Sequence, residues 1–252
     1  FYILIFLLLI KVEVFATHQR AAEITYKHIS GYTYEFTLIT YTFSLSPADR
    51  PQLEVNWGDG NSSILQRSQK TAVPGYNNID KNTYIGTHTY AAPSTYVVTM
   101  LDPNRNQGVI NIPNSVNVPI FISTTLVINP FVGPNNSPIL SNPPLDRGCV
   151  GVTFYHNPGA IDPEGDSLAY KLIPCRGDNG QNIIGYSYPF ATNSFSIDQQ
   201  TGTLTWDSPA AQGEYNVAIQ INEYRNGVLL SSITRDMQIN ILACDNQPPK
   251  II

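Results

Sequence analysis

The stretch YEFTLITYTF, from Tyr34 to Phe43, alternates apolar and polar side chains over most of its length. Successive side chains of a β-strand point to opposite faces, so this period of two residues predicts a strand with one buried face. Similar stretches recur along the chain with Gly, Pro, Asn and Asp between them, at residues 23–29, 53–57, 95–100, 118–128, 167–173, 202–206, 215–221 and 235–242. Helical periodicity is almost absent. Many short strands at this spacing predict an all-β chain made of β-sandwiches.

Composition and charge narrow the class of protein. The 252 residues are enough for two domains of ordinary size, and charged residues make up 13%, about half the usual share. The net charge is -5, and Lys and Arg form no cluster. These features argue against a nucleic-acid partner, so no nucleic acid is expected to bind.

The first sixteen residues are predicted to be a signal peptide that lacks its basic start. Ten apolar residues, Phe1 to Ile10, are too few to span a bilayer, and Val14 and Ala16 stand at positions -3 and -1 of a cleavage site. A buried strand or helix is the alternative. The mature protein is therefore expected to begin near Thr17, to be exported and to have no membrane span.

A repeated linker suggests the domain limits. GPNNSPIL (133–140) and CDNQPPKI (244–251) each place Asn, a polar residue and then Pro before an apolar residue. Asn136 and Asn246 lie 110 positions apart in the sequence, about the length of one sandwich domain. We expect domains at 17–132 and 141–245, with the linker at 133–140. Residues 246–252 are expected to start a linker to a further domain.

The first domain has the motif VNWGDG (55–60) followed by THTYAAPSTYVVTM (87–100). This pattern resembles the PKD (polycystic kidney disease) domain, an Ig-like β-sandwich. Trp57 is expected in the core, Gly58 and Gly60 in a tight turn, and Asp59 in bonds to local backbone amides. The residues between Asn61 and Gly86 exceed the usual length of a PKD loop and are predicted to form a long, decorated loop.

The second domain contains AIDPEGDSLAYKL (160–172), FSIDQQTGTLTW (195–206), GEYNVAIQINE (213–223) and the closing DNQPP. These segments resemble a cadherin-like or Ig-like bacterial surface domain. An LDRE-type motif is missing, and WDSP (206–209) stands in its place. Taken in order, the motifs of the whole chain resemble exported Bacteroidota proteins. Such proteins often end in a gliding-motility-associated domain that directs type IX secretion. The resemblance implies two tandem Ig-like sandwiches after a signal peptide.

The acidic turn carries Asp162, Glu164 and Asp166 within five residues. Three carboxylates this close repel one another, and calcium, which prefers six to eight oxygen ligands, would relieve the repulsion. A solvated acidic turn is the other main interpretation. A catalytic role is not favoured, because the carboxylates have no His partner. The matching cadherin turn helps to hold calcium between domains, and here linker Asn residues would supply further oxygens. Glu223 is expected to face the next linker, Asp245–Asn246, and not this site.

Other polar residues are given structural roles. DPNRNQG (102–108) lacks the Gly and Glu of an EF-hand and is predicted to be a polar hairpin turn. His88 is predicted to be a packed or hydrogen-bonded strand residue. Trp57 and Trp206 are predicted to lie in the core. A disulfide is predicted between Cys149 and Cys175, if the strands beside them pair antiparallel, which leaves Cys244 free or paired outside this sequence.

No motif for a nucleophile with its base, a metal triad or a cofactor loop is found, so we expect no enzyme. The sequence favours an exported cell-surface protein, an adhesin or structural stalk whose partner is an extracellular or surface protein or polysaccharide. The alternative is a set of accessory modules of a larger extracellular hydrolase. A carbohydrate-binding module would need exposed aromatic residues on one sheet.

Overall fold

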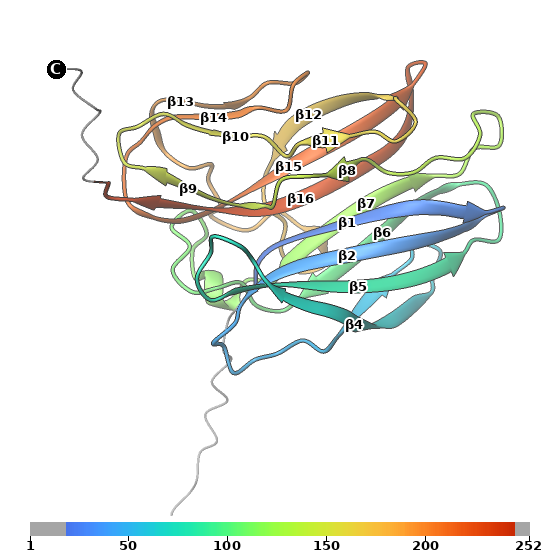
Figure 1. Cartoon of the computed structure of the whole chain (residues 1–252), viewed down its shortest axis with the longest axis horizontal. Helices are drawn as coiled ribbons and strands as arrows, with labels where there is room; N and C mark the ends of the chain where they lie inside the picture. Colours follow the sequence, from blue (N-terminus) through green and yellow to red (C-terminus); the bar gives the residue numbers. More distant parts are fainter. Residues whose placement is uncertain (1–18, 245–252) are drawn as a thin grey trace, which may run out of the picture.

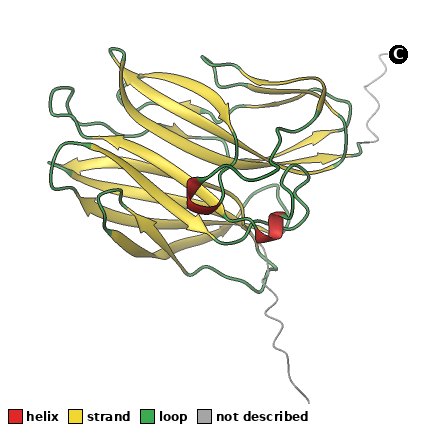
Figure 2. Ribbon diagram, turned by 180° about the vertical axis from the view of Figure 1, so that it is seen from behind, coloured by secondary structure: helices red, strands yellow, loops and turns green. Residues whose placement is uncertain are grey.

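The computed structural model describes residues 19–244, and β-strands form most of it (Figure 2). The predicted signal peptide and the segment 246–252 lie outside the described residues. Two short 3-10 helices, η1 (Ser115–Asn117) and η2 (Asp178–Gly180), are the helical elements of this part of the chain. Within it, no helix has the length and apolar character needed to cross a bilayer. The expected all-β fold is confirmed.

The strands form two halves that lie one above the other (Figure 1). The first half contains β1 (Gln19–Ser30), β2 (Thr33–Phe43), β3 (Gln52–Asn56), β4 (Ser62–Ala72), β5 (Ile79–Thr89), β6 (Thr95–Asp102) and β7 (Ile120–Val127). The second half contains β8 (Ile139–Leu140), β9 (Leu145–Cys149), β10 (Phe154–His156), β11 (Ala160–Ile161), β12 (Ser167–Ile173), β13 (Ala191–Ile197), β14 (Leu204–Pro209), β15 (Gly213–Arg225) and β16 (Val228–Leu242).

Strand β16 joins the two halves in one sheet. The strand order of this sheet is β1-β2-β5-β4-β3-β6-β7-β16-β15-β12. One edge of β16 pairs with β15, and the other edge pairs in turn with β7, with β1 at Ala22–Asp236, and with β9. The β9 pairing is parallel, whereas the other ladders are antiparallel. A strand from the second half therefore fills the seam between β7 and β1 of the first.

Each half has its own apolar core, because alternate residues of its strands point inward. The first core gathers around Trp57, Phe36 and Val98, and the second around Trp206, Ile219 and Met237. Trp57 and Trp206 are almost completely buried, as predicted. In β6, Val98 and Met100 are buried and Tyr96 is partly buried against the core.

The W-G-D-G turn is formed as the sequence predicts. Gly58 and Gly60 have φ angles of 83° and 90°, which strongly favour glycine. Asp59 accepts a hydrogen bond from the Asn61 amide at 3.0 Å and contacts His88 Nε2 at 2.7 Å. The ring of His88 stacks on Trp57 with centroids 5.0 Å apart. His88 is therefore a packed, hydrogen-bonded strand residue.

The predicted loop from Asn61 to Gly86 is instead β4 and most of β5, so that prediction was wrong. Strand β4 pairs with β3 and β5, but Leu65 is its only fully buried residue. A strand with so little apolar burial has a weak alternation signal, because its position is maintained by backbone ladders and not by a buried face.

The segment DPNRNQG begins the connection between the antiparallel strands β6 and β7, and parts of it are buried. Asp102 is fully buried beside Arg50, and Arg105 is fully buried against the second half. Two hydrogen bonds of 3.0 and 2.6 Å join the Arg105 guanidinium to Asp236 of β16. The sequence did not reveal the burial of Arg105, because the partner carboxylate lies 131 residues away.

The predicted disulfide is also corrected. Cys149 is bonded to Cys244, with Cα atoms 5.5 Å apart, and Cys175 is a buried free thiol. The prediction assumed that the strand after Cys149 pairs with the strand before Cys175. Instead, β10 pairs with β14, β12 pairs with β15, and parallel β9 brings Cys149 opposite Leu242, close to Cys244.

Candidate functional site

The acidic turn lies between β11 and β12, where the linker from the first half passes the second. One ligand atom from each of Asp162, Glu164 and Asp166 lies within 4.8 Å of the others. Asp162 Oδ1 accepts hydrogen bonds from the amides of Glu164 and Asp166 at 3.0 and 2.8 Å. The turn thus brings the three predicted carboxylates together. Asp162 Oδ2 is buried and has no hydrogen-bond partner among the described residues.

Arg225, at the end of β15, already neutralises part of this charge. Its guanidinium donates to both carboxylate oxygens of Asp166, at distances of 2.6 to 3.0 Å. It also donates to the carbonyls of Val132 and Pro134 and to Asn135 Oδ1. Asp166 is therefore first an anchor for Arg225, and only its remaining lone pairs could meet a metal ion.

The linker is held between the two halves at the same place. Ser137 exchanges hydrogen bonds with Tyr26 of β1, and the His28 amide donates to Asn136 Oδ1 at 2.8 Å. Asn136 Nδ2 donates to Glu164 on the acidic turn. The amide oxygens of Asn135 and Asn136, which were expected to serve calcium, therefore already accept hydrogen bonds from Arg225 and His28.

Glu223 lies beside this cluster, contrary to the prediction that it faces the following linker. It pairs with Leu168 in the ladder between β15 and β12. Because these strands run antiparallel, the end of β15 lies next to the start of β12, where the acidic turn ends. The position of Glu223 in its own strand could not reveal this neighbour. The described residues leave its buried carboxylate without a hydrogen-bond partner at either oxygen.

The electrostatics of Glu223 follow from this position. The pKa of its carboxyl is raised from 4.5 to about 8, with burial as the largest cause. Asn135 acts in the opposite direction, and the charges of Asp162, Asp166 and Glu164 add to the rise. Four carboxylates thus share one guanidinium. A proton on Glu223 or a bound cation would reduce the remaining negative charge.

The donor set fits a hard cation. The carboxylates whose ligand atoms lie close together are those of Asp162, Glu164 and Asp166, and Asp162 has one buried oxygen without a partner. Glu223 lies beside this group and adds negative charge. Oxygen ligands of this kind suit calcium, and water would complete the coordination shell. No Cys or His belongs to the cluster, so a zinc site is not favoured.

A second His–Asp pair lies away from the cluster. His156 Nδ1 contacts Asp146 Oδ2 at 2.8 Å, and His156 Nε2 is buried without a partner among the described residues. With His88 and Asp59, it gives the described chain two such pairs, in which the aspartate is partly exposed. A hydrogen-bonded pair that packs against the core has a structural role.

The most exposed aromatic residues are spread over both halves of the molecule. Phe131 follows β7 and is 98% exposed, Phe190 precedes β13, and Tyr155 lies on β10. Phe131 lies in the first half, whereas Tyr155 and Phe190 lie on and beside the two outer strands of the sheet β10-β14-β13. The described residues therefore do not show the aromatic platform that a carbohydrate-binding module would need.

Comparison with solved structures finds tandem immunoglobulin modules of the Drosophila receptor protein tyrosine phosphatase DLAR. Its N-terminal Ig1-2 module is 14% identical, with 88% of this chain and 99% of that chain covered and a TM-score of 0.28. A second structure, of tandem Ig repeats of Dlar, is 13% identical, with 89% and 100% covered and a TM-score of 0.28. A likeness this weak carries no argument about function. No family model and no curated protein matches the chain.

Proposed function

We propose that this chain belongs to an exported cell-surface protein and acts as a non-enzymatic adhesin or structural stalk. The observation that supports this most is strand β16, which lies in the sheet of both halves. A strand shared in this way opposes hinge motion, because bending would break its ladders. A rigid spacer of two fused sandwiches suits a protein that displays a binding surface away from the cell.

Two buried ion pairs add to this rigidity. Arg105 pairs with Asp236, and Arg235 of β16 pairs with Glu23 of β1 at 2.6 Å. Each of these side chains is at most 4% exposed. Separating the halves would leave these charges unpaired or expose them to water. The ion pairs therefore oppose small movements between the halves, although a buried ion pair adds little to the net stability of the fold.

Export is supported by the chemistry of the cysteines. The Cys149–Cys244 disulfide would persist in an oxidising compartment and be reduced in the cytosol. The order of motifs supports an exported Bacteroidota protein of the type IX secretion class. An extracellular or surface protein or polysaccharide is the partner that this proposal implies.

The stalk proposal is tested by measuring the distance between spin labels, one in each half. Exposed sites such as Gln69 of β4 and Lys171 of β12 can carry them as Cys variants in a Cys175→Ala background. A rigid unit gives one narrow distance distribution that does not change with salt. A broad or bimodal distribution would show a hinge and contradict the stalk.

We also propose that calcium binds at Asp162, Glu164 and Asp166, with Asp166 shared with Arg225 and Glu223 beside the site. The unpartnered buried oxygens of Asp162 and Glu223 support it. Ca²⁺ there would neutralise the carboxylates and tie the linker to the second half through Glu164 and Asn136.

Thermal unfolding in excess Ca²⁺ and in EDTA tests the calcium site. Calcium should raise the melting temperature of the wild type, since ligand that binds only the folded state adds RT ln(1 + [L]/Kd) to its stability. Asp162→Asn and Glu164→Gln should remove most of this gain. Glu54→Gln, at an exposed carboxylate in β3, is the control and should keep it. An equal melting temperature in both buffers would contradict calcium binding, and Arg225 would then be the cation that neutralises these carboxylates.

A further inference from the structure

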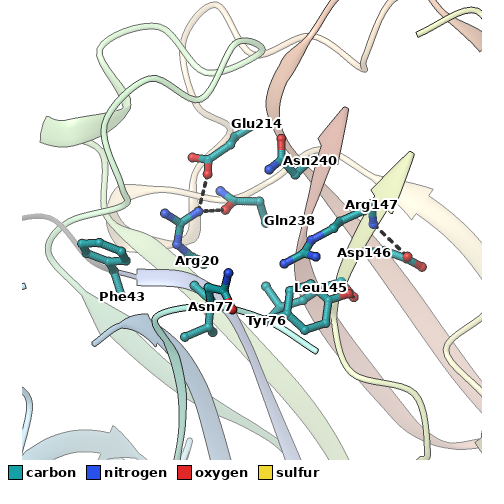
Figure 3. Close-up of a pocket in the computed structure, with 11 residues that line it drawn as sticks. Arg20, Phe43, Tyr76, Asn77, Leu145, Asp146, Arg147, Glu214, Gln238 and Asn240 are labelled. Atoms are coloured by element: carbon teal, nitrogen blue, oxygen red, sulfur yellow. Dashed lines mark hydrogen bonds and ion pairs between the residues drawn. The ribbon is translucent and has the colours of Figure 1, made fainter. Parts of the chain in front are cut away.

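A polar pocket opens between the two halves, on the side that Figure 3 shows. Its cavity volume is about 120 Å³. The first half contributes Arg20 of β1 and the Tyr76–Asn77 turn, and the second contributes Arg147 of β9 and Asn240 of β16. The pocket therefore exists only because β9 and β16 pack against the first half.

Arg20 forms one wall, and its charge is already matched. Arg20 Nη1 donates to Glu214 Oε1 and to Gln238 Oε1, both at 2.5 Å. Asn106 donates to the other oxygen of Glu214. Arg20 Nε is buried and has no partner within residues 19–244. The Arg20 side chain is therefore held in place, and Glu214, which neutralises it, is not available to a second cation.

Arg147 forms the opposite wall, and its charge is not matched. Its guanidinium carbon lies 4.6 Å from the centre of the Tyr76 ring, and Tyr76 is itself held by a 2.6 Å hydrogen bond to the Leu145 carbonyl. Among the described residues, no carboxylate forms an ion pair with Arg147. The neighbouring Asp146 is occupied by His156 and by the Arg147 backbone amide.

The two guanidinium groups reach into the pocket from opposite sides (Figure 3). Because Glu214 already neutralises Arg20, the unmatched charge is that of Arg147. The planar fork of its guanidinium matches a carboxylate in two parallel hydrogen bonds. The amides of Asn77 and Asn240 also line the pocket, and neither side chain is hydrogen-bonded to another described residue. Amides of this kind bind hydroxyl groups.

We propose that this pocket binds the carboxylate of a uronic acid residue in an acidic polysaccharide. Arg147 takes the carboxylate, while Asn77 and Asn240 take ring hydroxyls beside Tyr76. The volume suits a carboxylate and part of one sugar ring, with the rest of the chain outside. The inference rests on the proposed role as a surface-binding protein, and it names the ligand class.

The molecule carries a net charge of -5, so long-range attraction does not bring the polysaccharide to it. Recognition is therefore local, through one carboxylate at a time, and single sites are weak. Repeated units on one polysaccharide would strengthen attachment by avidity between many copies of the protein on a cell surface.

The test is titration calorimetry with trigalacturonate, the neutral galactose trimer and triglutamate. Trigalacturonate should bind and the neutral trimer should not. Arg147→Ala should weaken binding by about tenfold or more, because it removes a charge-assisted pair of hydrogen bonds. Lys171→Ala, which removes one exposed positive charge on β12, should change it less than about twofold.

Three results would overturn the proposal. These are no binding of trigalacturonate, equal effects of the two variants, and tighter binding of triglutamate, which would indicate an acidic peptide partner. Unchanged melting temperatures show that the variants are folded. The spin-label distances are independent of this pocket, so a rigid unit without uronate binding would reject only this inference.

Discussion

At Gly58, the turn between β3 and β4 meets β6 so closely that no side chain fits. A Cβ built there would lie 2.6 Å from the backbone nitrogen and oxygen of Val97. Trp57, the residue before it, fills the core and receives a hydrogen bond from Tyr90 to its carbonyl. The glycine is thus required by the approach of two backbones as well as by its φ angle.

Gly58→Ala should therefore destabilise the protein by about 3 kcal/mol, from backbone strain together with overpacking. Gly60→Ala is the matched control, since its φ is also positive but its Cβ would meet nothing within 4 Å. That variant should cost about 1 kcal/mol. Urea unfolding measures both. Equal losses would mean that strain alone explains the role of Gly58.

At the scale of elements, the end of β16 is fixed to β9 twice, by a parallel ladder and by the Cys149–Cys244 disulfide. The same strand β9 carries Arg147 into the polar pocket. The bond closes a loop with a sequence separation of 95 residues. Cross-linking positions so far apart restricts the unfolded chain strongly.

Replacing Cys149 and Cys244 together by Ser should lower the free energy of unfolding by about 4 kcal/mol. Cys175→Ala removes a buried thiol without a cross-link and should cost about 1 kcal/mol. Denaturant unfolding compares them. In the wild type, thiol titration under denaturing, non-reducing conditions should find one free cysteine. A peptide linking Cys149 to Cys175 would contradict the assignment.

At the scale of the whole molecule, the two halves meet through a polar layer and not only through apolar packing. The even-numbered residues Asp236, Gln238 and Asn240 of β16 face the first half, and Met237, Ile239 and Ile241 enter the second core. Strand β16 thus presents a polar face to the first half and an apolar face to the core of the second half.

Removing one member of the central pair should therefore be costly. Arg105→Ala leaves Asp236 buried without its main partner and should destabilise the protein by about 3–5 kcal/mol. Asp49→Ala breaks an ion pair with Arg67 in which the aspartate is half exposed, and should cost less than about 1 kcal/mol. Chemical unfolding at low and high salt checks both. A small loss of stability for Arg105→Ala would show that water reaches and solvates the Asp236 carboxylate.

Much of the fold could be predicted from local sequence. Alternation predicted the strands around Phe36, Val98 and Ile219, and the W-G-D-G motif predicted its own turn, because period and turn chemistry act over a few residues. The acidic turn was also recognised from its spacing. Strand β4 was missed because it buries almost nothing, and the local signal depends on burial.

What the sequence by itself determined is the class of the chain: strands, turns, two tryptophan-centred cores and three carboxylates in one turn. Only the tertiary structure decided which strands are neighbours. It placed β16 beside β1, β7 and β9, which paired Cys149 with Cys244, buried Arg105 against Asp236 and brought Glu223 to the acidic turn. The physical reason is that backbone ladders are the same for every sequence, so pairing between distant strands is selected by side chains that meet only after folding.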